Sequence, residues 1–409
     1  MKRNLLVFQT AYTYAQMQEN NILDFFTSKD LDGFFTQVIT VNAFGEYTSS
    51  SKMHGAPLRI NHDQTHIYLE ATNSKYRLLL KLPFLNFLFS QVKLVLSLNK
   101  LLKEYDIDLI RGEDPRYNGV LATIFSKKLR VPFVIGNWGN PDTIRSLTNK
   151  PMAPRIFKSI RVEKFIENLV FNQADYCIAQ NSDNLNYIKQ YRVPDEKLGF
   201  FRLGNAINPV HFSVPDFRNK FNFELNYGIK TDEFVVTCVS ALEKRKIVED
   251  ALESFALIYR EKKSHLILLG CGTNETEYRD LARALGVEHS VTFAGMVVQN
   301  TVSEILAGSD VILSPLTGRA LAEGMLSSTP VVAYDVDCHP DFIDDGKNGF
   351  LVPFRDFASM AERSLELLSD QYLRKELGSR GRETALNMLN PERLVEEQRN
   401  QFTKIIELG

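Results

Sequence analysis

Short apolar runs alternate with longer amphipathic stretches through the second half of the chain, and this order restricts the possible folds more than any other feature. The apolar runs that we interpret as strands cover residues 234–239, 266–270, 291–294, 311–314 and 331–334. Between them, helical spacing is found at residues 248–259, 277–285, 302–306 and 320–326. Continuous apolar strands separated by helices are typical of a parallel sheet that helices cover on both faces. The second half is therefore predicted to be a domain of βαβ units.

The first half repeats this order less regularly, with strands expected at residues 5–9, 38–41, 66–70, 109–111, 133–135 and 176–179. Residues 205–228 are polar and aromatic, contain Pro209 and Pro215, and show no clear period, so we place the connection between two domains there. Asn390 and Pro391 suit the cap and first turn of a last helix. We predict an α/β protein of two Rossmann-like domains facing a cleft. The domains are residues 1–208 and 209–390, and a terminal helix, residues 391–409, packs back toward the first domain.

The composition is that of a globular protein without a strong charge. A chain of 409 residues exceeds what one core usually supports, and its 44% of apolar residues suffices for two cores. The formal net charge is -2, whereas proteins that follow a phosphate backbone carry a strong cationic excess. We therefore expect no nucleic acid as a partner.

Cysteine usage indicates a reducing compartment. Cys177, Cys238, Cys271 and Cys338 lie far apart, with neither zinc nor disulfide spacing, and we interpret them as core thiols. The apolar run at residues 5–8 is too short for a signal sequence, and polar residues interrupt the apolar segment at residues 84–102. We expect a cytoplasmic protein that does not cross a bilayer.

Four stretches of the second half follow one another at the ends of predicted strands. They are Ser240-Ala-Leu-Glu-Lys-Arg-Lys246, Leu268-Leu-Gly-Cys-Gly-Thr273, Val291-Thr-Phe-Ala-Gly295 and the longer run from Ser314 to Ala333. In this order they resemble the donor domain of the family-four retaining glycosyltransferases, which have the two-domain fold called GT-B. The resemblance implies that residues 1–208 bind an acceptor and residues 209–390 bind a nucleotide sugar. A looser resemblance at residues 171–182 and 203–205 extends the match over most of the chain.

The resemblance assigns several residues to the donor. Lys246 matches a family lysine that contacts the donor diphosphate, and Gly272 matches a Gly-x-Gly turn. Glu323 matches the second of two family glutamates, whose carboxylate accepts hydrogen bonds from the ribose hydroxyls. Two positions depart from the family, because Ala241 stands where it has an arginine and Pro315 where it has the first glutamate.

The predicted helix start at residues 317–319 offers a substitute for the missing arginine. Thr317 and Gly318 precede a helix whose free amides favour an anion such as a diphosphate. Our hypothesis is that Arg319 supplies the cation that Ala241 lacks, with Arg245 as the second candidate. The alternative is that Arg319 is a solvated residue. Lys246 and Arg319 are predicted to be catalytic, since a transferase without a metal must neutralise the departing diphosphate.

Three other patterns resemble cofactor or metal motifs. Gly270-Cys-Gly272 could open a dinucleotide site, but Glu275 occupies the position of the third glycine. Asp335-Val-Asp337 has the form of a metal motif, yet its place after a late strand favours loop structure or acceptor contact. His62 and His66 have metal spacing without a third ligand nearby, and we interpret them as surface histidines. We expect neither a metal nor a cofactor.

Acceptor recognition is expected in the first half. After the strand at residues 133–135 the family often carries a histidine facing the cleft, and this chain has Asn137 and Trp138 there. A sugar ring stacks on an indole, although a core tryptophan is the alternative. Tyr12 lies in the aromatic loop after the first strand, where the family has a glycine-rich turn. These three residues are the acceptor-side candidates.

Residues 145–164 combine cations with apolar side chains. The cations are Arg145, Lys150, Arg155, Lys158, Arg161 and Lys164, and the single acid among them is Glu163. Together with the amphipathic residues 82–102, this stretch would hold the first domain on anionic lipid. The alternative is an ordinary helix with a solvated basic face.

These observations together predict a metal-independent retaining hexosyltransferase. It would move a sugar from a nucleotide diphosphate sugar, UDP-sugar rather than GDP-sugar, to a glycan or lipid-linked acceptor in polysaccharide or glycoconjugate assembly. Peripheral attachment to the inner face of a membrane stays open. The alternatives are a nucleotide-sugar epimerase or a phosphorylase on a related fold, and a non-catalytic partner that binds a nucleotide sugar.

Overall fold

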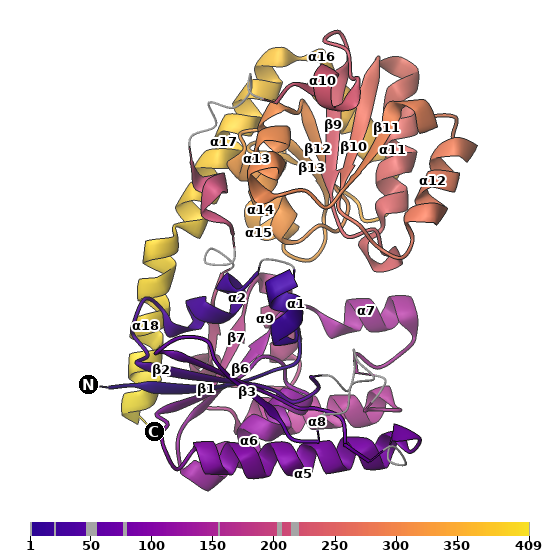
Figure 1. Cartoon of the computed structure of the whole chain (residues 1–409). Helices are drawn as coiled ribbons and strands as arrows, with labels where there is room; N and C mark the ends of the chain where they lie inside the picture. Colours follow the sequence, from indigo (N-terminus) through magenta and orange to yellow (C-terminus); the bar gives the residue numbers. More distant parts are fainter. Residues whose placement is uncertain are drawn as a thin grey trace. The chain divides into compact units, whose positions relative to one another are not determined.

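The computed structural model describes residues 2–19, 22–45, 55–76, 80–153, 156–202, 207–213 and 221–408. The chain divides into two compact units (Figure 1). The first comprises Met1–Arg202 and Pro391–Gly409, and the second comprises Leu203–Asn390. Each unit contains its own sheet and its own core.

The sheet of the first unit is parallel except at one edge. In the described residues its order is β3-β4-β2-β1-β5-β6-β7-β8. The strands are β1 Asn4–Gln9, β2 Gln37–Asn42, β3 Leu58–Asn61, β4 His66–Glu70, β5 Leu109–Gly112, β6 Phe133–Asn137, β7 Tyr176–Ala179 and β8 Leu198–Phe200. Among the strands that the structure describes here, only β3 runs antiparallel to its neighbour, with Leu58 opposite Glu70. The central strand β1 pairs Leu5 with Val38 of β2 and with Leu109 of β5.

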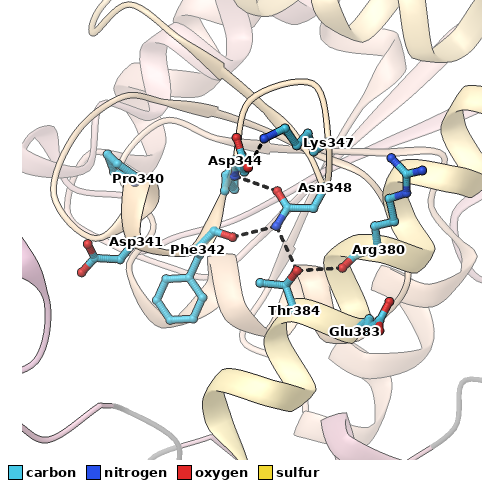
Figure 2. A pocket seen from close by; sticks show the side chains of 10 residues that line it. Pro340, Asp341, Phe342, Asp344, Lys347, Asn348, Arg380, Glu383 and Thr384 are labelled. Atoms are coloured by element: carbon cyan, nitrogen blue, oxygen red, sulfur yellow. Dashed lines mark hydrogen bonds and ion pairs between the residues drawn. The ribbon is translucent and has the colours of Figure 1, made fainter.

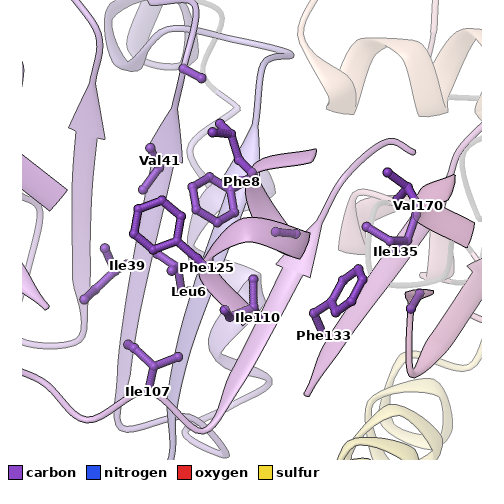
Figure 3. Packing of buried hydrophobic residues seen from close by; sticks show 14 of the residues in the cluster. Leu6, Phe8, Ile39, Val41, Ile107, Ile110, Phe125, Phe133, Ile135 and Val170 are labelled. Carbon is purple, nitrogen blue, oxygen red and sulfur yellow. The ribbon is translucent and has the colours of Figure 1, made fainter. Parts of the chain in front are cut away.

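Alternate residues of β1 enter two cores, as the period of a strand requires. Leu6 and Phe8 pack under α5 (Pro83–Leu101), α6 (Tyr117–Leu129) and α8 (Ile160–Gln173) (Figure 3). Leu5 and Val7 face the opposite side, which α18 (Pro391–Leu408) covers with its buried Phe402. The terminal helix therefore completes the core of the first unit.

The second unit has a parallel sheet with the order β11-β10-β9-β12-β13-β14. The strands are β9 Phe234–Val239, β10 Ser264–Leu269, β11 Val291–Gly295, β12 Val311–Ser314, β13 Val331–Tyr334 and β14 Phe350–Val352. One face carries α11 (Val248–Glu261), α12 (Glu275–Ala284) and α16 (Phe357–Ser369). The other carries α13 (Gln299–Gly308), α14 (Arg319–Leu326) and α17 (Gln371–Leu389).

The predicted strands and helices of the second half are all present, and the α/β fold class is confirmed. Three short strands, β3, β8 and β14, were not predicted. The connection, in which the sequence shows no clear period, contains η4 (Pro209–Phe212) and α10 (Phe223–Tyr227). Residues 203–205 and Pro215 lie outside the described residues. Among the described helices, none has both the length and the hydropathy needed to cross a bilayer.

Candidate functional site

The strand order of the second unit indicates where a ligand would bind. The chain runs from β9 through β10 to β11 on one side, and from β12 through β13 to β14 on the other. The loops that follow β9 and β12 therefore leave their strands in opposite directions. In open parallel sheets, such a switch point opens a crevice beyond the carboxyl ends of the two strands. The loop after β9 holds Lys246, and the loop after β12 holds Gly318.

Lys246 joins these two loops. Its half-buried Nζ donates a hydrogen bond to the backbone oxygen of Leu316 over 3.2 Å. Burial lowers the pKa of Lys246, and the neighbouring Arg245 lowers it further, against the attraction of Asp337. The structure thus brings the predicted lysine to the loop before α14, with its cation partly removed from water.

The loop after β12 is shaped by Gly318, the residue before α14. Its backbone angles, φ 64° and ψ -118°, fall in a region that favours glycine. A Cβ atom added there would meet no atom within 4 Å, so the space beside this backbone is open. The Thr317 hydroxyl forms a hydrogen bond with that of Ser314. Arg319 is the first residue of α14, as predicted, and it is exposed.

Glu323 lies one helical turn after Arg319 and is only 7% exposed. Among the described residues, its carboxylate has no hydrogen-bond or ion-pair partner. Neither carboxylate oxygen belongs to the described side-chain atoms that are fully enclosed without a partner, so both can be reached from outside. Such a group is suited to receive donors from a ligand.

The Gly-x-Gly turn after β10 packs against the loop after β9. A Cβ atom at Gly270 would lie 2.0 Å from the Ser240 oxygen, and one at Gly272 would lie 2.3 Å from the Leu242 oxygen. The Leu242 amide also donates to the Cys271 oxygen over 3.0 Å. Loop packing therefore accounts for both glycines, and contact of Gly272 with a donor stays a prediction. Cys271 is exposed, so its interpretation as a core thiol is wrong, whereas the other three cysteines are buried.

The loop after β13 lies beside Lys246 and contains the Asp-x-Asp pattern. His339 is buried, and its Nδ1 is 2.8 Å from the Tyr334 oxygen. Burial lowers the pKa of His339 to about 4, and the charge of Lys246 also lowers it. Within the described ranges, no group of three or more His, Cys, Asp or Glu side chains is placed to hold a metal ion.

The corresponding switch point of the first unit lies between β1 and β5. The loop after β1 is anchored there, since the Tyr12 oxygen accepts hydrogen bonds from Asn42 Nδ2 and Tyr68 Oη, both over 2.7 Å. The Tyr14 amide donates to Glu70 Oε2 over 3.0 Å. The Tyr12 ring itself is 38% exposed. A fixed backbone thus presents an accessible aromatic side chain.

Trp138 is half-buried and is held by a charged cluster that the sequence did not single out. Its Nε1 donates to Glu113 Oε2 over 2.7 Å, and the Arg111 guanidinium lies 5.3 Å from the ring centroid. Burial by itself raises the pKa of Glu113, but Arg111 and Lys29 hold it below its ordinary value. The sequence feature that could have predicted this cluster is the charged run at residues 111–114, at the end of a predicted strand. Neighbouring Asn137 is buried and donates to the Asn184 oxygen over 3.4 Å.

Two interpretations of charged residues in the first half are wrong. His66 is buried, with its ring nitrogens against Asp63 and the Thr27 oxygen, and His62 Nδ1 lies 2.7 Å from Tyr14 Oη. Tertiary packing of α2 (Asp24–Thr27) against β4 is what buries His66. His66 is therefore not a surface histidine, whereas the side chain of His62 is 24% exposed.

The basic stretch is likewise not a single exposed helix. It spans α7 (Pro141–Thr148) and the start of α8, and Arg145 is buried. Arg145 donates to Glu163 over 2.6 Å, to Glu167 over 2.9 Å and to Tyr187 over 2.7 Å. Lys164 pairs with Asp142 at 2.9 Å. Arg155 lies outside the described residues.

Comparison with known proteins shows which family the second unit is similar to. Residues 219–384 match the sequence profile described as Glycosyl transferases group 1. This part of the chain is therefore similar to that family. The match contains the crevice at the switch point and all residues that we assigned to the donor.

Individual glycosyltransferases are similar to parts of the chain of different lengths. The chain is 28% identical to N-acetyl-alpha-D-glucosaminyl L-malate synthase of Bacillus anthracis over 193 residues, which is 46% of this chain and 50% of the relative. It is 24% identical to the capsular polysaccharide biosynthesis glycosyltransferase CapM of Staphylococcus aureus over 77% of this chain and 90% of the relative. For the first of these and for others, the chain spans only about half of the curated relative's length.

Solved glycosyltransferases share the fold. The structure of HepE from Anabaena in complex with UDP superimposes with a TM-score of 0.71 at 17% identity, covering 98% of this chain and 100% of that chain. The predicted GT-B fold is thereby confirmed. The predicted resemblance to these glycosyltransferases is confirmed as well.

A separate hollow of about 630 Å³ lies between the loop after β13 and α17 (Figure 2). Asn348 spans one side of it, donating to the Phe342 oxygen and to Thr384 Oγ1, both over 3.0 Å, while its Oδ1 accepts from the Asp344 amide over 2.8 Å. The lining residues are Pro340, Asp341, Phe342, Ile343, Asp344, Lys347, Asn348, Arg380, Glu383 and Thr384. They do not include the residues assigned to the donor, so this hollow is distinct from the crevice at the switch point.

Proposed function

We propose that the chain transfers a sugar from a nucleotide diphosphate sugar, a UDP-sugar in particular, to a glycan or lipid-linked acceptor. The observation that carries this proposal is the contact between Lys246 and the Leu316 oxygen at the β9–β12 switch point, beside the open backbone of Gly318. The match of residues 219–384 to the glycosyl transferases group 1 profile supports it.

The roles of the residues follow from their chemistry. Lys246 would bind the diphosphate and stabilise the negative charge that grows on it as the sugar departs. Glu323 would accept hydrogen bonds from the vicinal ribose hydroxyls, which gives its buried carboxylate the partners it lacks. Arg319, exposed at the start of α14, is the hypothesis for a second cation.

We also propose that transfer proceeds with retention and without a metal ion. Retention rests on the family resemblance. Metal independence rests on the two cations, Lys246 and Arg319, and on the amides at the start of α14, which together supply positive potential for a diphosphate. Gly272 and Thr317 complete the proposed donor contacts, and Tyr12, Trp138 and Asn137 remain the proposed acceptor contacts.

The proposed location is the cytoplasm, at the inner face of a membrane where lipid-linked acceptors are assembled. The wide spacing of the four cysteines, which favours a reducing compartment, supports the cytoplasmic part of this proposal.

Calorimetric titration of the full chain with UDP, GDP and ADP tests the assignment. We expect UDP to bind most tightly, with the same affinity in EDTA as in magnesium. Loss of UDP binding in EDTA would contradict the metal-independent part. Equal affinity for the three nucleotides would contradict the preference for a UDP-sugar.

Arg319 is tested by variants in the same titration. Arg319→Lys keeps the charge but loses bidentate hydrogen bonding to phosphate, so we expect weaker UDP binding. Ala241→Arg should restore binding to Arg319→Ala if both side chains reach one phosphate. Full affinity in Arg319→Ala would mean that Arg319 is only a solvated residue.

A further inference from the structure

Helix α5 has a second apolar face that the core does not cover. Leu94, Leu98 and Leu101 are buried in the core of the first unit. The opposite side carries a row of large apolar residues, which follow one another at spacings of one to four positions. Each of them is between 46% and 74% exposed: Phe84, Leu85, Leu88, Val92 and Leu96. A helix that serves only the core would carry polar residues at these positions.

Helix α8 carries a similar row in the same helical layer. Val162, Phe165 and Leu169 are 52%, 64% and 42% exposed. Both helices, with α6, cover one face of the sheet through a shared core (Figure 1). Ile124 of α6 is also exposed. Rows of exposed large apolar side chains, such as those on α5 and α8, are uncommon on monomeric proteins and are typical of interaction sites.

The charge of this layer is positive. Helix α5 contains Lys93 and Lys100 and no acidic residue, and Lys81 precedes it. On α8 the two acids, Glu163 and Glu167, are buried and paired with Arg145, whereas Arg161 is exposed. The outer surfaces of α5 and α8 therefore carry no acidic side chain, while lysines flank the apolar row of α5.

We propose that the outer surface of α5 and α8, defined by Phe84, Leu85, Leu88, Val92, Leu96, Val162, Phe165 and Leu169, binds an anionic lipid bilayer. Apolar side chains enter the boundary between headgroups and acyl chains, and the flanking lysines contact the anionic headgroups. The surface lies on a helical layer of the first unit, whereas the donor residues lie in the second. The inference rests on the proposed function in one respect: the enzyme would encounter a lipid-linked acceptor at such a bilayer.

Co-sedimentation of the full chain with vesicles tests the proposal. We expect the wild type to bind vesicles of mixed phosphatidylglycerol and phosphatidylcholine, and to bind pure phosphatidylcholine at least about tenfold more weakly. The triple variant Leu88→Ser, Val92→Ser, Leu96→Ser should lose about tenfold or more in partition coefficient. Lys93→Gln with Lys100→Gln should weaken binding to the anionic vesicles alone.

A matched control uses exposed apolar residues of the second unit. Leu225 and Tyr372 are 81% and 76% exposed, and Leu225→Ser with Tyr372→Ser should leave vesicle binding unchanged. Circular dichroism and the melting temperature show whether each variant is folded. UDP affinity should be unchanged in the triple variant, so a failure of lipid binding is distinguished from a failure of the donor site.

Three results would overturn the proposal. The first is a wild type that does not bind anionic vesicles, and the second is a folded triple variant that binds them as tightly as the wild type. The third is a wild type that does not bind vesicles but forms a dimer in solution, with a triple variant that is a monomer. The surface would then be an interface between two copies of the chain.

Discussion

Lys246 is the residue on which the donor site depends most. Its ammonium group is half-buried and already donates to a carbonyl of the neighbouring loop, so little reorganisation is needed for it to meet a phosphate oxygen. The adjacent Lys244 provides a contrast, because it is 70% exposed and pairs with Glu277 at 2.7 Å. Two lysines of one short helix, η5 (Lys244–Lys246), are thus expected to behave differently.

Lys246→Ala should weaken UDP binding by about 1.5 to 3 kcal/mol, the usual range for a hydrogen bond to a charged group. Lys244→Ala should change it by less than about 0.5 kcal/mol, as expected for a surface substitution. Isothermal titration calorimetry measures both. Equal effects of the two variants would mean that Lys246 makes no specific contact with the nucleotide.

The affinity for UDP should also depend on pH in a characteristic way. Burial lowers the pKa of Lys246 from its ordinary value of 10.5, so the free protein loses this cation at a lower pH than an exposed lysine would. Affinity is complete while Lys246 is charged and falls as the pH rises through this lowered pKa. Lys246→Arg stays charged over this range, so its affinity should not fall. A decline of the same size in Lys246→Arg would assign the titration to another group.

Glu323 should affect nucleotide binding much more than stability. Glu323→Gln keeps the size of the side chain, and neither carboxylate oxygen is fully enclosed, so the melting temperature should change by less than about two degrees. The same change should weaken UDP binding by about 1 to 3 kcal/mol, because the ribose hydroxyls lose a charged acceptor. Thermal unfolding and calorimetry on one preparation measure both. If 2′,3′-dideoxy-UDP loses as much affinity as UDP on this substitution, Glu323 does not hold the ribose.

At the scale of helices and strands, sequence periodicity was most informative where elements are long or fully buried. The strands β7, β9, β12 and β13 were predicted with their observed bounds, because each is an unbroken apolar run between helices. The missed strands β8 and β14 have three residues each, and β3 lies exposed at a sheet edge. Such strands depend on pairing with a neighbour and leave no periodic signal of their own.

Ion pairs between helices were the least predictable feature. Arg145 of α7 has partners 18, 22 and 42 residues away, on α8 and on α9 (Ser182–Lys189). In the sequence it looked like one cation of a basic surface. Only the packing of three helices shows that its charge is buried, and the same holds for the carboxylate of Glu113 beside Trp138.

Arg145→Ala should lower the free energy of unfolding of the first unit by about 3 to 5 kcal/mol, because it leaves Glu163 and Glu167 buried without this cation. Arg161→Ala, on the exposed side of α8, should cost less than about 0.5 kcal/mol. Urea unfolding followed by fluorescence of Trp138, the only tryptophan, reports on the first unit. Equal midpoints for the two variants would show that the buried network adds nothing to stability.

For the whole molecule, the order of βαβ units predicted two α/β units, and the chain path explains the terminal helix. The chain completes the second unit and then supplies α18 to the core of the first, where Phe402 packs against Phe35 and Phe201 with ring centroids 5.9 and 5.1 Å apart. Arg399 also donates to the Leu31 oxygen over 2.6 Å. Both sheets have a switch point. The candidate donor and acceptor residues follow either the two strands that form such a point or a strand that neighbours one of them.

The central claim is that the crevice at the β9–β12 switch point activates a nucleotide sugar rather than only binding it. Release of UDP from UDP-glucose by the full chain, in EDTA and without an acceptor, tests this claim most directly. We predict slow release by the wild type, release by Lys244→Ala at the wild-type rate, and a decrease of about 100-fold in Lys246→Ala, the size expected when a transition-state charge loses one stabilising group. A wild type that binds UDP and UDP-glucose but releases no UDP, even with acceptors present, would contradict the account and identify a nucleotide-sugar-binding protein.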